Sequence, residues 1–199
     1  MKVTVLLNAA LDELYQRVRP VLALIRNGRR GAGAGVLAGD GLVLTNLHVV
    51  GRARSVQVLL DDGSSCDARV IARDPHVDLA LLQIPSNSHA SAVFSNSTPR
   101  PGELVYAFGH PWGQRNVLTG GVLSAVTSLR GRHGRVPVLR ADVQLAPGNS
   151  GGPLLNTAGE VIGLNAMIFG GDQSVAIPSS LIQNFLAGAR KDKRTEGLL

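Results

Sequence analysis

The sequence has few aromatic residues, one cysteine and no long hydrophobic run, and each scarcity excludes a class of protein. With Cys66 as the only cysteine, the chain forms no internal disulfide, so its stability must come from a hydrophobic core. No apolar stretch approaches the roughly 20 residues that a membrane-spanning helix needs, so we expect no membrane span. Aromatic residues make up 4% of the chain and do not interleave the scattered arginine clusters that carry its net charge of +6. Nucleic-acid binding is therefore not expected, because scattered arginine usually serves solubility.

Glycine and short aliphatic runs are abundant instead. Hydrophobic residues make up 44% of the 199 residues and charged residues 17%, which is the balance of a folded protein of one or two compact units. The 24 glycines separate short runs of valine, leucine and isoleucine, a pattern typical of many short strands. We therefore predict an all-β fold of two antiparallel six-stranded β-barrels, with a short helix at each end of the chain.

A polar segment divides the expected strands into two halves. The Pro- and Ser-rich residues 85–102 predict a connection between residues 1–92, which hold the first barrel, and residues 93–199, which hold the second. In the second half, Ser180 and Gln183 predict a capping box at the start of the last helix. Strands in the first half are expected at residues 21–26, 55–60, 67–74 and 78–84, with a hairpin about the Gly39-Asp40-Gly41 turn.

The N-terminal stretch MKVTVLLNAALDELYQ begins like a signal peptide. Its apolar part is short, and Asp12 and Glu13 lie where a cleavage site should be, so no signal peptide is expected and the compartment stays open. Residues 8–19 predict a helix instead, because Asn8 can cap it, leucines recur on one face, and Pro20 ends it.

The stretch APGNSGGPLL, residues 146–155, surrounds Ser150 with glycine. A flexible linker would share this composition, but the flanking apolar residues argue against a linker. A catalytic serine needs backbone amides aimed at a developing oxyanion, and glycine permits the turn that aims them. We therefore expect Ser150 to be a nucleophile, with an oxyanion hole formed by Gly148, Asn149 and Ser150.

A base and a carboxylate complete such a site. His48 ends the apolar strand VLTNLHVV, where an imidazole has no packing role, and Asp78 opens the core strand HVDLALLQI, where an unpaired carboxylate would be costly. Cys66 lacks a neighbouring histidine motif and is expected to be structural. The remaining histidines lie in polar or turn segments without paired ligand spacing, so neither a metal site nor a cofactor is expected: His76, His89, His110 and His133.

The segments TNLHVV, DLALLQI and GNSGGPLLN, in this order, closely resemble the three catalytic segments of trypsin-like serine proteases of the HtrA/Deg type. The resemblance extends over nearly the whole chain through the further segments FGHPWG, LTGGVLSAV and VAIPSS. The resemblance implies a chymotrypsin-like fold and a serine endopeptidase that acts on unfolded or misfolded polypeptide. His48 would be the general base, Asp78 would orient it, and Ser150 would form the acyl-enzyme.

The resemblance also places a substrate pocket beside the nucleophile. Gln144 stands where trypsin has its basic-selecting aspartate, so an arginine or lysine side chain would lack a counter-ion and a small or aliphatic residue is expected before the cut. The residues expected to bind substrate are Gln144, Leu145, Leu164, Asn165, Ala166 and Ala176.

Other family properties transfer less directly. Leu47, Ala146 and Ala166 depart from common family residues near the site. Family members are mostly extracytoplasmic and commonly continue into PDZ domains. Few residues follow the expected final helix here, so we expect either a protein without a PDZ domain or an isolated protease domain. Family members also commonly form trimers through the N-terminal segment. Here the apolar face of residues 6–18 is expected either to mediate a homotrimer or to pack on the chain's own barrel.

Loops near the family site govern its activity, and the corresponding segments are residues 110–116, 127–139 and 168–174. Trp112 is expected to anchor the first of them. A chaperone-like polypeptide-binding module with a latent site is the alternative to an active peptidase.

Overall fold

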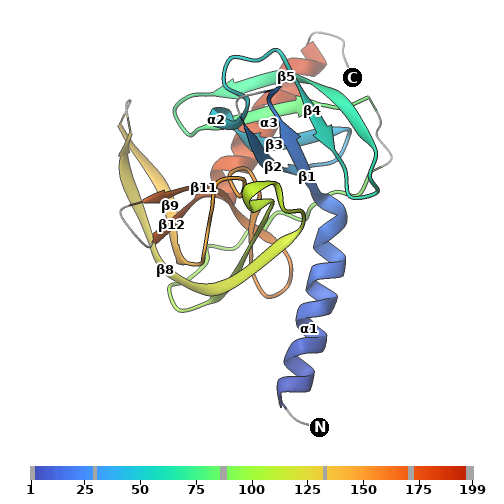
Figure 1. Ribbon diagram of the computed structural model, residues 1–199. Coiled ribbons are helices and arrows are strands. Elements are labelled where there is room, and N and C mark those ends of the chain that lie inside the picture. Colours follow the sequence, from blue (N-terminus) through green and yellow to red (C-terminus); the bar gives the residue numbers. More distant parts are fainter. Residues whose placement is uncertain (1–2, 29–30, 86–88, 132–133, 170–172, 196–199) are drawn as a thin grey trace.

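Two closed antiparallel barrels make up the body of the protein (Figure 1). The computed structural model describes residues 3–28, 31–85, 89–131, 134–169 and 173–195. The first barrel has the strand order β1-β2-β3-β6-β5-β4 and the second β10-β11-β12-β9-β8-β7, which confirms the predicted fold class. The strands are β1 Leu22–Arg26, β2 Ala32–Leu37, β3 Leu42–Asn46, β4 Ser55–Leu59, β5 Ser65–Asp74, β6 Leu79–Gln83, β7 Leu104–Gly109, β8 Val117–Gly131, β9 Gly134–Asp142, β10 Pro153–Leu155, β11 Val161–Phe169 and β12 Gln173–Pro178.

The first barrel follows the sequence pattern closely. The Gly39-Asp40-Gly41 turn joins β2 to β3, with the Leu42 amide donating to the carbonyl of Gly39 at 2.8 Å. Strands β3 and β6 are buried almost throughout because aliphatic residues occupy both of their faces. These two strands pair with each other, and Asn46, the last residue of β3, lies opposite Leu79, the first of β6. The residues just beyond this pair are therefore brought together.

A long ribbon replaces one of the expected loops in the second barrel. Residues 127–131 and 134–139 belong to β8 and β9, which pair from Val122↔Asp142 to Gly131↔Gly134. The prediction of a loop over residues 127–139 was wrong, because alternate valine and leucine side chains of the ribbon pack on the barrel while its arginines face outward. Residues 132–133 lie outside the described residues, as do residues 170–172 of the predicted loop 168–174, whose other residues belong to β11 and β12.

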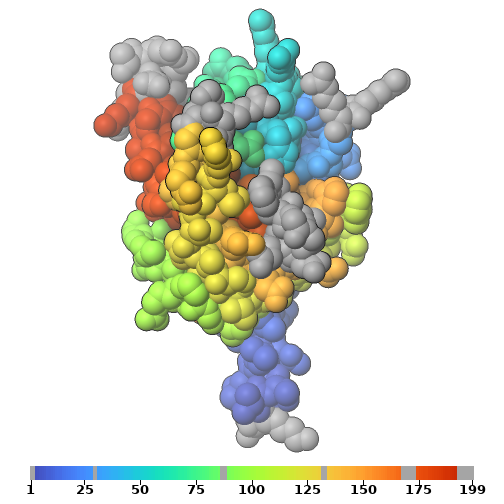
Figure 2. All heavy atoms as spheres, turned by 90° about the vertical axis from the view of Figure 1, so that its left-hand side faces the viewer, coloured from blue at the N-terminus to red at the C-terminus, as the bar shows by residue number. Residues whose placement is uncertain are grey.

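The N-terminal helix, α1 Val3–Val18, is longer than predicted and projects from the barrels (Figures 1 and 2). Asn8 lies within the helix instead of capping it, because nothing in residues 3–7 breaks a helix. Leu14 and Val18 are its buried residues, whereas Val3, Val5, Leu6 and Leu7 are at least half exposed. A short 3-10 turn, η1 Arg19–Val21, contains Pro20 and leads into β1.

The C-terminal helix, α3 Ser179–Thr195, packs across both barrels. Gln183 Nε2 donates to the Ser179 hydroxyl at 3.1 Å, a contact between side chains four residues apart, so the predicted capping box of Ser180 and Gln183 is replaced by a different bond. The Ser179 hydroxyl in turn donates to the carbonyl of Ser95 at 2.8 Å, and Arg190 reaches the carbonyl of Ala38 in the first barrel at 3.0 Å. None of the helices in the described part of the chain is both long and apolar enough to cross a membrane.

Candidate active site

His48 and Asp78 meet where β3 and β6 end. The short helix α2 Leu47–Val50 starts directly after β3, and Asp78 precedes β6. The Asp78 carboxylate accepts the main-chain N–H of His48 at 2.9 Å and lies 2.6 Å from its Nδ1. The carbonyl of Asp78 also accepts from the Leu47 amide at 3.0 Å and from Asn46 Nδ2 at 3.1 Å. Strand pairing therefore fixes both the main chain and the side chain of this acid.

The geometry of the pair suits proton transfer. Asp78 has φ +58°, a left-handed conformation that aspartate tolerates better than most residues and that often marks functional positions. The two side chains are 45% and 34% exposed, so a reacting group can reach the imidazole. Because the carboxylate lies against Nδ1, the neutral imidazole carries its proton there and presents Nε2 as a base.

Ser150 lies on a loop of the second barrel that packs against the first. Its carbonyl accepts from the Ala34 amide of β2 at 2.8 Å. A Cβ built on Gly33 would lie 2.7 Å from the Val49 side chain and 3.1 Å from that carbonyl, so the Ser150 loop and α2 approach the same point on β2. The Ser150 hydroxyl donates to the carbonyl of Ala166 at 3.0 Å, and no hydrogen bond joins it to His48 within the described residues.

A main-chain hydrogen bond holds the Pro147–Gly148 peptide in one orientation. The carbonyl of Pro147 accepts from the Trp112 amide at 2.7 Å, and because C=O and N–H of a trans peptide point opposite ways, the Gly148 N–H faces away from Trp112. Over the residues that the structure describes, neither the Gly148 nor the Ser150 amide has a hydrogen-bond partner. The Asn149 amide does, since it donates to the carbonyl of Ala146 at 3.0 Å.

Comparison with known proteins agrees with this geometry. Residues 33–164 match the family described as trypsin-like peptidase domain. The chain belongs to this family. It is 41% identical over 152 residues to a probable periplasmic serine endoprotease DegP-like of Pseudomonas fulva, covering 73% of this chain and 32% of that protein. It is 37% identical over 168 residues to serine protease HTRA1 of Xenopus tropicalis, covering 80% and 36%. The chain thus spans about a third of the length of these relatives.

A solved structure supports the same membership. The crystal structure of the serine endoprotease from Yersinia pestis superposes with a TM-score of 0.81 and 31% sequence identity, covering 91% of this chain and 66% of that chain. The similarity to HtrA/Deg-type proteases stated from the sequence motifs is confirmed.

The predicted substrate-binding residues of this trypsin-like peptidase differ in burial. Gln144 is exposed, and Ala166 presents its carbonyl to Ser150. Leu164 and Ala176 are buried in the core, and Asn165 is buried with its Nδ2 donating to the carbonyl of Pro153 at 2.9 Å. Leu145 is half-buried against the core of the second barrel.

His110 holds the main chain at Gly148, a contact that the sequence analysis missed. It follows β7 and is fully buried; its amide donates to the carbonyl of Gly148 at 3.3 Å, and its Nδ1 accepts from the Asn116 amide at 3.2 Å. Burial lowers the pKa of His110 to about 4; the main chain of Ala23 opposes this shift, and Arg115 reinforces it. The only available signal was a histidine before Pro-Trp-Gly.

Trp112 is an anchor through its main chain alone. It lies in the 3-10 turn η3 Pro111–Gly113 with φ +54°, and its side chain is 78% exposed. The contact that ties this predicted loop anchor to the Ser150 loop is made by the Trp112 amide, which donates to the carbonyl of Pro147 at 2.7 Å.

The rival reactive groups have unsuitable surroundings. Burial and the neighbouring Asp67 raise the pKa of the half-buried Cys66 thiol, which lowers its thiolate content. In the described segments, no three His, Cys, Asp or Glu side chains cluster as a metal site would require. His133 lies outside the described residues.

Proposed function

We propose that this chain is a serine endopeptidase of the HtrA/Deg type that cleaves unfolded or misfolded polypeptide. The observation that carries the proposal is the His48–Asp78 pair, held at 2.6 Å, beside a serine whose own amide and that of Gly148 lack partners in the described structure. Acyl transfer needs a base oriented by a carboxylate, and it needs amide N–H groups that are free to bind an oxyanion.

In this mechanism, the Ser150 hydroxyl rotates from the carbonyl of Ala166 toward His48, a change between staggered rotamers. His48 Nε2 removes the hydroxyl proton while the oxygen attacks the substrate carbonyl, and Asp78 stabilises the imidazolium. The amides of Gly148 and Ser150 bind the oxyanion. His48 then protonates the leaving amine, and water hydrolyses the acyl-enzyme through the same base.

The substrate is an extended chain whose residue before the cut is small or aliphatic. No carboxylate stands at Gln144 to receive a basic side chain. Mapping the cuts in casein tests this preference, which dominant cleavage after arginine or lysine would contradict.

The N-terminal helix is the part of the chain that we propose to mediate assembly. The exposed apolar residues of α1 favour a homotrimer formed through this helix over packing on its own barrel. We also propose that residues 1–92 and 93–199 form the two halves of one protease domain.

Labelling with a fluorophosphonate probe tests the peptidase. We expect covalent labelling and casein digestion by the wild type, and neither by Ser150→Ala, because the hydroxyl is the only nucleophile of the mechanism. The Ser150–Ala166 hydrogen bond favours one rival, a chaperone-like module with a latent site. Absence of labelling, together with suppression of aggregation by both proteins, would establish that rival.

A further inference from the structure

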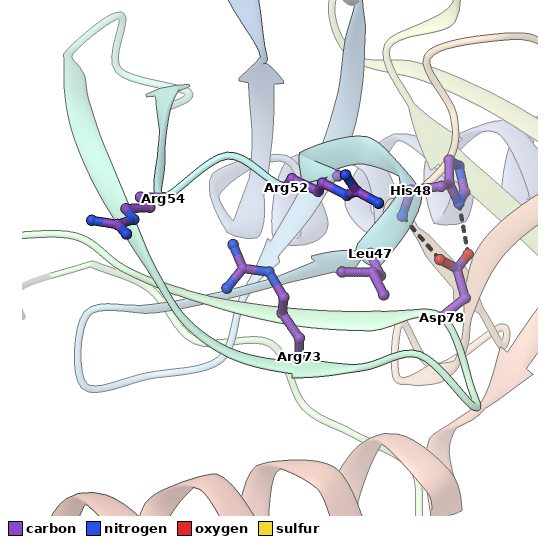
Figure 3. A pocket seen from close by; sticks show the side chains of 7 residues that line it. Leu47, His48, Arg52, Arg54, Arg73 and Asp78 are labelled. Atoms are coloured by element: carbon purple, nitrogen blue, oxygen red, sulfur yellow. Dashed lines mark hydrogen bonds and ion pairs between the residues drawn. The ribbon is translucent and has the colours of Figure 1, made fainter.

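A cavity of about 620 Å³ adjoins the His48–Asp78 pair on the first barrel (Figure 3). Three arginines line it, Arg52 and Arg54 from the segment after α2 and Arg73 from β5. In Figure 3 the Arg73 side chain rises from β5 toward that segment, where its Nη2 donates to the carbonyl of Ala53. We call these three arginines with Leu47 the arginine pocket.

The arginine pocket lacks a counter-charge of its own. Among the described residues, none of its arginines forms an ion pair with a carboxylate. Both oxygens of Asp78 are engaged by His48. The other acid of the turn, Asp74, accepts main-chain N–H groups through Oδ1, of His76 at 2.8 Å and Val77 at 3.4 Å.

These features suit an anionic ligand with a short aliphatic stem. Guanidinium groups stay protonated and offer paired donors that match a carboxylate. Three like charges around one cavity attract an anion and repel a cation. Leu47 gives the wall an apolar surface on which methylene groups can pack.

We propose that the arginine pocket binds the carboxylate of a glutamate or aspartate side chain in the polypeptide substrate. It acts as a specificity site that selects an acidic residue near the scissile bond, because His48 forms its rim. This inference rests on the proposed peptidase function, which the labelling experiment tests separately.

Binding is measured without catalysis, with Ser150→Ala protein and pairs of fluorescent peptides. Each pair differs only by Glu or Gln, placed in turn at every position that flanks a mapped cleavage site. At one position we expect the Glu peptide to bind about five- to tenfold more tightly, the effect of a partly exposed charge-assisted contact. Raising the salt concentration should reduce this ratio.

The double variant Arg52→Gln/Arg73→Gln should bring the Glu-to-Gln ratio close to one. Arg69→Gln is the matched control, since Arg69 is also exposed on β5 but does not line the cavity, and it should keep the wild-type ratio. Thermal unfolding confirms that each variant is folded.

Equal binding of Glu and Gln peptides at every position would overturn the inference, as would a ratio unchanged in the double variant. Equal peptide binding with tight binding of inorganic phosphate would likewise overturn it, and would identify a small-anion site. In each case fluorophosphonate labelling of the wild type would leave the peptidase function standing.

Discussion

The two barrels contribute to the candidate site by different physical means. The first supplies His48 and Asp78 from the ends of paired, buried strands, and their side chains bond directly to each other. The second supplies Ser150 from a loop shaped by main-chain hydrogen bonds to Trp112 and Ala34. Changes in the first barrel should therefore alter proton chemistry with the fold intact, whereas changes in the second should alter geometry.

Asp78→Asn should have the largest effect on this contrast. An asparagine keeps one oxygen for the His48 amide but can place an NH₂ against Nδ1, which favours the wrong tautomer. We expect kcat/KM for a peptide substrate to fall by about 10⁴, with the melting temperature nearly unchanged. A loss of less than tenfold would show that His48 does not depend on this carboxylate.

Gly148→Ala should have the next largest effect, because it alters the geometry of the second-barrel loop that carries Ser150. Gly148 has φ +109°, and a Cβ there would lie 2.2 Å from the carbonyl oxygen of His110, so the main chain at Gly148 must move. We expect kcat to fall by about 10²–10³ with a smaller change in KM, as for loss of an oxyanion donor.

Gly63→Ala is the control for Gly148→Ala. Gly63 has a comparable φ of +86° but open space around its Cβ position, far from the site in the β4–β5 turn. It should cost some stability and leave kcat unchanged. Equal kcat losses in the two variants would contradict a specific role for the contact with His110.

The buried His110 should make the stability of the folded protein sensitive to acid. Its pKa is lowered by burial from 6.5 to about 4, so between these values the unfolded chain binds a proton that the folded chain does not. Stability is therefore full above pH 6.5 and falls as the pH drops toward 4, by up to about 3 kcal/mol. Urea unfolding of Ser150→Ala protein at several pH values measures this.

The charged groups that face His110 are Arg115, which disfavours its protonation, and Asp61, which favours it. His110→Asn in the same background should flatten the pH dependence between 6.5 and 4. A variant with the unaltered slope would assign the acid sensitivity to other groups.

Cys66→Ser should have the smallest effect. The cysteine lies in β5 away from the Ser150 loop, and its raised pKa makes it a poor nucleophile. We expect labelling and peptide cleavage within about twofold of wild type, since a conservative substitution of a half-buried residue outside the site should have little effect on activity. Loss of labelling would contradict the assignment of the nucleophile to Ser150.

Strong local patterns were predicted correctly. The Gly39-Asp40-Gly41 hairpin and the buried strand before His48 follow from turn chemistry and aliphatic runs. The extent of the β8–β9 ribbon and the start of α1 were predicted incorrectly. Neither a long twisted hairpin nor an extended helix N-terminus has a strong local signal in the sequence.

Aliphatic periodicity, glycine and the three motifs are local features, so the strand-rich fold and the types of residue at the site could be predicted without a structure. How these residues meet depends on long-range packing, which local features do not encode. The pairing of β3 with β6 joins His48 to Asp78, and the packing of a second-barrel turn buries His110 beneath Gly148. Convergence of Arg52, Arg54 and Arg73 on one cavity also depends on the barrel, since long-range packing brings together charges that a sequence only spaces apart.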